Sequence, residues 1–435
     1  MVSVAPWRLE DPISQAMDIN IVVPPLARTR FTGGIWCVMQ HAQQLGERGH
    51  RVRVVPTHPC GEPDWVPRPW AFSLVNDTQR HAATRGLRAI GETVTAALRF
   101  KLSRRMQPST AEEACIRAGI GYFGLALANF GLHGQRMGAA VDHLARVLPD
   151  ADTTVATDTE TVWPVALAGR GALAYFAQHY EPYFWKERLG GQASRRESEL
   201  SYRLGLFQLA NSPWLQQKLQ AETGRRVWLC PNAIDHAIFH GDVVPRQLSE
   251  PLRIISYGGR GAEWKGFREL CEAMRIVSKQ VPAGMFQWSV YGGALLPPDN
   301  PVCKYQALGF LTPEALASAY RANHVLLSAS WYESFPLFPI EAMACGLAAI
   351  TSQPGTEAFA EHMRTAWVIP PRDPGALAHA ILTLAADEPL RQSIAQAGRE
   401  RATQFTWAGA GATMDAALRE VVAASADTKS ASSID

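Results

Sequence analysis

The sequence has few of the features that mark membrane, secreted or nucleic-acid-binding proteins. None of its apolar runs reaches the roughly 18 residues that a membrane-spanning helix needs. The N-terminal segment 1–18 contains prolines and charges and lacks the apolar core of a signal peptide. A formal net charge of +2 gives no basis for binding nucleic acid. We therefore expect a cytoplasmic protein without a nucleic-acid partner.

Cysteine is also too scattered to build a structural site. The chain has seven cysteines, an odd number, and none of them forms a C-x-x-C pair. This pattern predicts reduced thiols and neither a disulfide framework nor a zinc site. Histidines and carboxylates likewise form no cluster with metal-ligand spacing. We expect no bound metal and no cofactor.

What the sequence has is the composition of a large globular protein. Hydrophobic residues make up 47% of the 435 positions and charged residues 19%. A chain of this length is too long for one hydrophobic core, so two domains of about 200 residues each are expected.

The first half alternates between strand and helix signals. An apolar run at 18–24 predicts a buried strand, a helical pattern covers 35–48 and ends near Gly49, and a second strand begins at Arg51. Further strands are predicted at 153–156, 172–177, 207–210 and 227–229. This order is typical of a doubly wound parallel sheet.

A second alternation follows a turn-rich connector after Pro231. We predict an N-terminal extension (1–17), a Rossmann-like domain (18–235), a second Rossmann-like domain (236–406), and a C-terminal helix with a tail (407–435) that packs back across the domains. Open parallel sheets bind ligands at the carboxyl ends of their strands, so two such halves imply a cleft between them.

The segment ESFPLFPIEAMACG, residues 333–346, places two carboxylates around a helix start. Glu333 lies in the preceding loop and Glu341 lies one turn into the helix, while Pro339 fits the first helical turn. The free N–H groups of that helix end suit a diphosphate flanked by hydroxyl-rich groups, as in a nucleotide-sugar. A capped surface helix with two acids explains the segment equally well.

Three further segments could contribute to such a site. In SYGGRGAEWKGF a strand ends in glycines such as Gly259, and Arg260 and Lys265 follow before a helix, which suits a diphosphate but also an ordinary turn. The pair Gly33 and Gly34 precedes the first helix and is weak evidence alone. The aromatic loop at 175–185 contains His179 and has the composition of a sugar pocket, although a single histidine is more often structural.

Two other features have less specific interpretations. The stretch 80–105 carries seven basic residues against Glu92 and predicts either a solvated helix face or contact with an anionic membrane surface. The D-x-D triplet at 150–152 matches a metal-binding pattern of some sugar transferases, but it precedes a buried strand. We interpret it as a chance match.

Taken together, these segments resemble the family-4 glycosyltransferases of the GT-B fold over most of the chain. ESFPLFPIEAMACG is similar to the family's E-x7-E signature, and GGRGAEWKGF is similar to its G-R-x4-K-G element. The segments LANSPWLQQKL, PNAIDHAIF and TGGIW with LGERGHRVRVV resemble three more family elements in the same order.

The resemblance implies a role for each matched residue. Arg260 and Lys265 would hold the donor diphosphate, Glu341 would bind the ribose hydroxyls, and Glu333 would face the donor sugar. The first domain would hold the acceptor and the second the nucleotide-sugar. The reaction would retain the anomeric configuration and need no metal. Backbone N–H groups around Phe335 and Leu337 would contact sugar hydroxyls.

Other matches narrow or qualify this interpretation. Pro336 stands where glycine is common and removes one N–H donor from the sugar pocket, and Ala233 replaces a family glycine. The loop AQHYEPYFW resembles rhamnosyltransferases that use dTDP-rhamnose in bacterial surface-glycan assembly. Either His179 or Gln178 would be the active-site residue of that loop. A nucleotide-sugar epimerase and a non-catalytic nucleotide-sugar-binding partner are the alternative functions.

Overall fold

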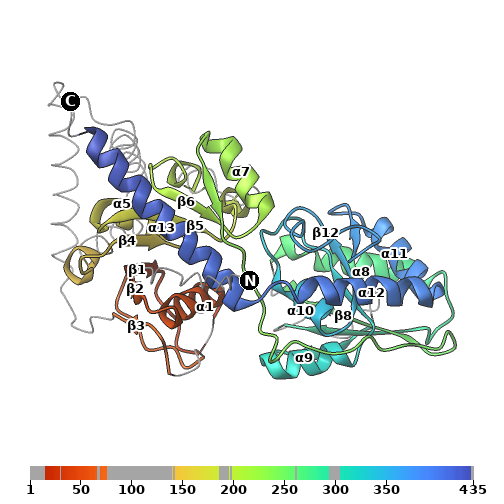
Figure 1. The fold of residues 1–435 in the computed structure, drawn as a ribbon. Helices are drawn as coiled ribbons and strands as arrows, with labels where there is room; N and C mark the ends of the chain where they lie inside the picture. Colours follow the sequence, from red (N-terminus) through yellow and green to blue (C-terminus); the bar gives the residue numbers. More distant parts are fainter. Residues whose placement is uncertain are drawn as a thin grey trace, which may run out of the picture.

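The computed structural model describes residues 15–29, 31–65, 69–75, 140, 143–185, 195, 198–259, 262–292 and 304–432. The basic stretch 80–105 and Arg260 lie outside these ranges. Figure 1 shows two α/β domains connected side by side. Within the described residues, no helix is long and apolar enough to cross a lipid bilayer.

The N-terminal domain contains a seven-stranded parallel sheet with the order β3-β2-β1-β4-β5-β6-β7. Its strands are β1 (Asp18–Val23), β2 (Arg51–Pro56), β3 (Ser73–Leu74), β4 (Thr153–Ala156), β5 (Ala172–Ala177), β6 (Phe207–Ala210) and β7 (Val227–Leu229). Most residues of β1, β4 and β5 are buried, as expected for parallel strands that are covered on both faces.

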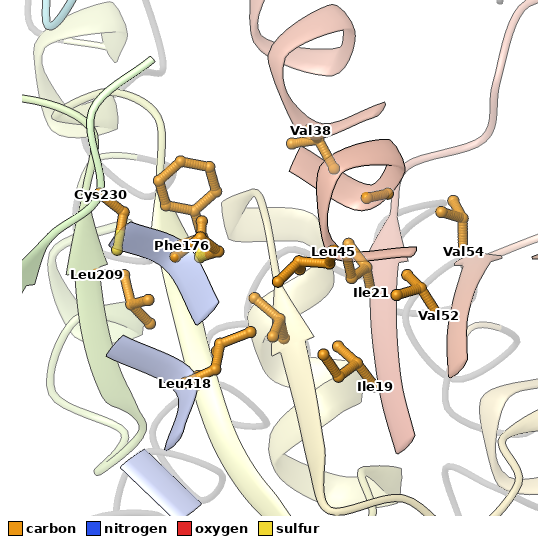
Figure 2. Close-up of a cluster of buried hydrophobic side chains, with 14 of the residues drawn as sticks. Ile19, Ile21, Val38, Leu45, Val52, Val54, Phe176, Leu209, Cys230 and Leu418 are labelled. Carbon is orange, nitrogen blue, oxygen red and sulfur yellow. The ribbon is translucent and has the colours of Figure 1, made fainter. Parts of the chain in front are cut away.

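Helices cover both faces of this sheet. They are α1 (Gly33–Glu47), α5 (Thr159–Ala168), α7 (Pro213–Thr223) and the C-terminal α13 (Trp407–Ser432). Figure 2 shows the core on one face, where Leu45 of α1 and Leu418 of α13 lie near Ile19 and Phe176 of the strands. Side chains of α5 and α7 form the buried cluster on the other face.

The C-terminal domain contains a six-stranded parallel sheet with the order β10-β9-β8-β11-β12-β13. The strands are β8 (Leu252–Tyr257), β9 (Phe286–Tyr291), β10 (Gln306–Gly309), β11 (Val325–Ser328), β12 (Ala348–Ser352) and β13 (Trp367–Ile369). The helices are α8 (Phe267–Ser278), α9 (Pro313–Arg321), α10 (Leu337–Ala344), α11 (Pro374–Ala386) and α12 (Glu388–Ala402). Helices α8 and α11 cover one face, and α9 and α10 contribute to the core on the other.

The chain crosses between the domains twice, and the two crossings lie side by side. Ile234 forms a parallel bridge with Thr406, and the backbone N–H of Ile234 donates to the carbonyl of Phe405 at 3.3 Å. After the second crossing, α13 packs against α1 and contacts β5 and β7 (Figure 1). The last helix therefore completes the core of the first domain.

The predicted fold class, two Rossmann-like parallel sheets, is confirmed. The helix starts agree closely with the expected ones. α10 begins at Leu337, so Pro339 lies in its first turn and Glu341 lies one turn into the helix, as predicted. α1 begins at Gly33, two residues before the predicted helix 35–48. The helix after Lys265 begins at Phe267, because a 3₁₀ turn (η3, Glu263–Lys265) ends at Gly266 with a φ of 72°.

Replacing Leu418 with alanine is expected to destabilise the N-terminal domain by about 2–5 kcal/mol. The side chain is fully buried between α1 and the sheet, so its removal leaves a cavity. Urea unfolding followed by circular dichroism measures the loss. Leu167→Ala, on the exposed side of α5, is the matched control, because Leu167 is 49% exposed. Equal stability of the two variants would contradict this account of α13.

Candidate functional site

The carboxyl ends of the two sheets meet at one interface between the domains. From the N-terminal domain come His179, which follows β5, and Ser212, which follows β6. From the C-terminal domain come Glu333 and Ser334, which follow β11. The hydroxyls of Ser212 and Ser334 lie 3.2 Å apart, and His179 Nε2 lies 3.8 Å from Glu333 Oε2. The first domain thus reaches the acidic motif of the second.

Lys265 and Glu333 form a partly buried ion pair at this interface, in which Glu333 is buried and the Lys265 side chain is 25% exposed. Lys265 Nζ donates to Glu333 Oε1 at 2.5 Å, although 68 positions separate the two residues in the chain. Burial raises the pKa of Glu333, but Lys265 and His179 outweigh that effect and lower its pKa to about 2. Glu333 is therefore a carboxylate at neutral pH.

Two glycines hold this pair by close backbone packing. A Cβ on Gly355 would overlap the carbonyl of Glu333, and the N–H of Glu333 donates to the carbonyl of Pro354 at 3.1 Å. A Cβ on Gly266 would overlap the carbonyl of Ala329, just after β11. Both glycines also have positive φ angles, 108° and 72°. Sequence reasoning missed Gly355, because an isolated glycine after a strand looks like any turn.

Glu341 lies in α10, and its carboxyl group is buried. It is 8% exposed, and its Oε2 has no hydrogen-bond partner among the described residues. Burial raises the pKa of Glu341 to about 8. A buried carboxyl oxygen without a partner is costly unless a ligand supplies a donor, and a hydroxyl group is such a donor.

The first turn of α10 faces the first turn of α1. No side chain caps α10, since its N-cap residue is Pro336, whereas Thr32 caps α1 by accepting from the N–H of Ile35 at 3.3 Å. A Cβ added at Gly33 would lie 3.7 Å from Leu337 Cδ1. The predicted glycine loop and the predicted sugar-facing segment are therefore neighbours, while the Phe335 ring packs into the core.

The loop after β5 docks on the C-terminal domain through aromatic rings. The rings of His179 and Phe184 lie 4.3 Å apart between centroids, and the rings of Phe184 and Trp264 lie 5.2 Å apart. The hydroxyl of Tyr332 donates to the carbonyl of Tyr183 at 2.9 Å. Because Trp264 precedes Lys265, this docking also restrains the segment that carries the lysine.

Glu181, which the sequence groups with His179 in the same loop, turns away from the interface. Its carboxyl accepts from the N–H of Thr159 at 3.0 Å and from the hydroxyl of Tyr175 at 2.9 Å. Burial, with the nearby Asp158 carboxyl, raises the pKa of Glu181 to about 8. Glu181 therefore anchors the loop on the first turn of α5.

The glycine turn before η3 packs against Lys265. Gly259 adopts a φ of 77°, and a Cβ added there would lie 3.3 Å from the Cβ of Lys265. Arg260 lies outside the described residues.

The D-x-D triplet lies at the amino end of β4, where Asp152 accepts from the N–H of Asp18 at 2.8 Å. In the described part of the chain, no three His, Cys, Asp or Glu side chains gather as a metal site.

Comparison with known proteins gives one family match and several similar folds. Residues 252–387 match the family model described as glycosyl transferases group 1. The structure resembles sucrose-phosphate synthase of Thermosynechococcus elongatus, with a TM-score of 0.63, 18% identity, and 93% and 99% of the two chains covered. It also resembles Anabaena Alr3699/HepE in complex with UDP and glucose, with a TM-score of 0.60, 16% identity, and 93% and 100% covered. The chain therefore has the GT-B fold, and its C-terminal domain contains the group 1 segment.

Two curated relatives are similar over part of the sequence. The O-antigen biosynthesis protein RfbC of Myxococcus xanthus is 27% identical over 266 residues, which is 60% of this chain and 20% of the relative. A D-inositol 3-phosphate glycosyltransferase of Corynebacterium efficiens is 26% identical over 198 residues, which is 42% of this chain and 46% of the relative. The chain thus spans about a fifth and about half of these two relatives.

Glu341→Gln is expected to change how stability depends on pH. Burial raises the pKa of Glu341 to about 8 in the folded protein, whereas the unfolded chain releases this proton near the ordinary glutamate pKa of 4.5. Stability should therefore fall as pH rises from 4.5 to 8, by about 3–5 kcal/mol from this group. The glutamine variant has no proton to release at this position, so it should be more stable than the wild type at pH 8. Urea unfolding at several pH values measures the free energy of unfolding, with the exposed Glu314→Gln as the control. The same pH dependence in the wild type and in Glu341→Gln would contradict the raised pKa.

Proposed function

We propose that the protein is a glycosyltransferase that moves a sugar from a nucleoside-diphosphate sugar to a glycan, lipid-linked or small-molecule acceptor. The observation that carries the proposal is the Lys265–Glu333 pair, which meets His179 of the other domain at the carboxyl ends of both sheets. The group 1 family match over the same domain supports it.

The donor would bind mainly to the C-terminal domain. The Lys265 ammonium would neutralise the diphosphate together with Arg260, and the uncapped end of α10 would add backbone N–H donors. The unpaired Oε2 of Glu341 would accept from a ribose hydroxyl. Glu333, a carboxylate at neutral pH, would lie beside the donor sugar, where it can stabilise positive charge that develops on the ring.

The reaction would break the bond between the sugar and the diphosphate oxygen and form a bond to an acceptor hydroxyl, with retention of configuration. The leaving diphosphate takes the bonding electrons, so stabilising its negative charge lowers the barrier. No metal and no cofactor is assigned a role, because Lys265 and Arg260 supply positive charge. His179 would border the reacting sugar on the acceptor side.

We also propose a role for this reaction in the cell. The name of the RfbC relative supports a role in polysaccharide or glycoconjugate synthesis. The loop after β5 favours rhamnosyl transfer from dTDP-rhamnose as a specific donor. The enzyme would act in the cytoplasm, and the basic stretch 80–105 would contact anionic lipid near the acceptor. Co-sedimentation with anionic vesicles at low salt tests that contact.

Lys265→Ala is expected to lower turnover of the nucleotide-sugar about 100-fold while the protein stays folded, because one charge that stabilises the leaving diphosphate is lost. Glu341→Ala should lower it at least tenfold. The assay measures release of nucleoside diphosphate with wild type and variants. Lys279→Ala, at the exposed C-terminal end of α8, is the control. Wild-type turnover in both site variants would refute the site.

One nucleotide among UDP, GDP, dTDP and ADP is expected to raise the melting temperature of the protein more than the others, because a ligand stabilises the folded state only when it binds that state. A thermal-shift panel of the four nucleotides measures this difference. A shift with dTDP would support the rhamnosyl donor. EDTA should change neither this shift nor turnover. A loss restored by magnesium or manganese would refute metal independence, and nucleotide binding without turnover would favour the non-catalytic alternative.

A further inference from the structure

A chain of side-chain amides connects the two domains beside the Lys265–Glu333 pair. The hydroxyl of Ser334, next to Glu333, donates to Asn211 Oδ1. Asn211 Nδ2 then donates to the backbone carbonyl of Gln178 at 3.0 Å and to Gln178 Oε1 at 3.3 Å. Asn232 Nδ2 donates to the same Oε1 at 3.3 Å. Two asparagines therefore fix which way the Gln178 amide points.

The other end of that amide has no acceptor. Gln178 Nε2 is buried and has no hydrogen-bond partner among the described residues. A buried N–H without an acceptor costs free energy, and a ligand that supplies an acceptor would remove this cost. Because Oε1 already accepts twice, Gln178 offers only N–H donors.

This donor lies where the two domains meet. Gln178 directly follows β5. A Cβ added at Gly34, in the first turn of α1, would lie 3.8 Å from the Cβ of Gln178. The neighbouring Gly33 faces Leu337, in the uncapped first turn of α10. The amide thus lies near the N-terminal ends of α1 and α10, whose free N–H groups favour negative charge.

We propose that Gln178 donates its Nε2–H to an oxygen of the β-phosphate of the bound nucleoside diphosphate, the phosphate that a monophosphate lacks, and that Asn211 and Asn232 are positioning residues that hold the amide in this orientation. The inference rests on the proposed function and adds to it a contact from the N-terminal domain. A phosphate oxygen only accepts hydrogen bonds, which matches a side chain that only donates. A sugar hydroxyl would also need an acceptor for its own proton.

The contact depends on both domains. Ser334 belongs to the C-terminal domain, and its hydroxyl occupies Asn211 Oδ1, which leaves Asn211 Nδ2 directed at Gln178. When the domains separate, Asn211 loses this bond, while Gln178 keeps both of its asparagine partners. Because the diphosphate would bind mainly to the C-terminal domain, the phosphate contact is completed only when the domains are together.

The test compares Gln178→Ala and Gln178→Glu with the wild type by calorimetric titration. The ligands are the nucleoside diphosphate that stabilises the wild type best and the matching monophosphate. We expect Gln178→Ala to bind the diphosphate about tenfold more weakly, because a hydrogen bond to a charged group is lost. Gln178→Glu should bind it more weakly still, since a carboxylate repels phosphate. Monophosphate affinity should change less than threefold in both variants.

Gln396→Ala is the matched control, because the Gln396 amide donates to Glu400 on the surface of α12, away from the interface. Asn232→Asp tests the positioning role. An aspartate oxygen facing Gln178 Oε1 should turn the amide round, so this variant should show the same reduced preference for diphosphate over monophosphate. Circular dichroism confirms that each variant folds.

The outcomes separate the inference from the proposed function. If no nucleoside diphosphate binds the wild type, the proposed function fails. If the wild type binds but Gln178→Ala binds equally well, only the inference fails. If Gln178→Glu binds the diphosphate as well as the wild type, the amide does not face phosphate and the inference is overturned. If Asn232→Asp leaves the preference for diphosphate unchanged, the positioning role is overturned.

Discussion

The partly buried ion pair between Lys265 and Glu333 is the interaction on which the arrangement of the site depends. Removing two charges from water is costly, and their mutual attraction compensates only when the geometry is good. Here the geometry is set by backbone: Gly266 packs on the end of β11 and Gly355 packs on the carbonyl of Glu333. The pair holds Glu333 ionised despite its burial.

The same pair gives the protein a charged centre that a ligand can rearrange. A diphosphate bound at Lys265, as proposed, would compete with Glu333 for the ammonium, so donor binding and the electrostatic state of Glu333 would be coupled. Glu341 has the opposite environment, with no positive partner and a raised pKa. Two glutamates in one motif therefore reach opposite protonation states at neutral pH.

The interface between the domains is polar at its centre and aromatic at its edge. Ser212, Ser334 and Asn211 meet in the middle, while Phe184 and Trp264 pack beside them. Hydrogen bonds require a specific geometry, whereas ring packing tolerates small shifts. The combination fixes how the two domains pack at this interface, where each domain contributes groups that the other lacks.

Much of the fold follows from the sequence alone, because strands and helices are encoded by local apolar patterns and by caps such as Gly49. The spacing of Glu333 and Glu341 likewise predicts a helix start between two acids, and the structure has one. The alternation of β and α elements predicts that strand ends carry the site. These features depend on residues that are neighbours in the chain.

The partners of those residues depend on the tertiary structure. Nothing local in the sequence indicates that Lys265 reaches Glu333, that Glu181 turns toward α5, or that Asn211 and Asn232 orient Gln178. Each of these contacts joins residues from different strand ends, and sheet order, not sequence distance, decides which ends are adjacent. Protonation states follow from the same contacts, because burial and nearby charge are properties of the folded chain.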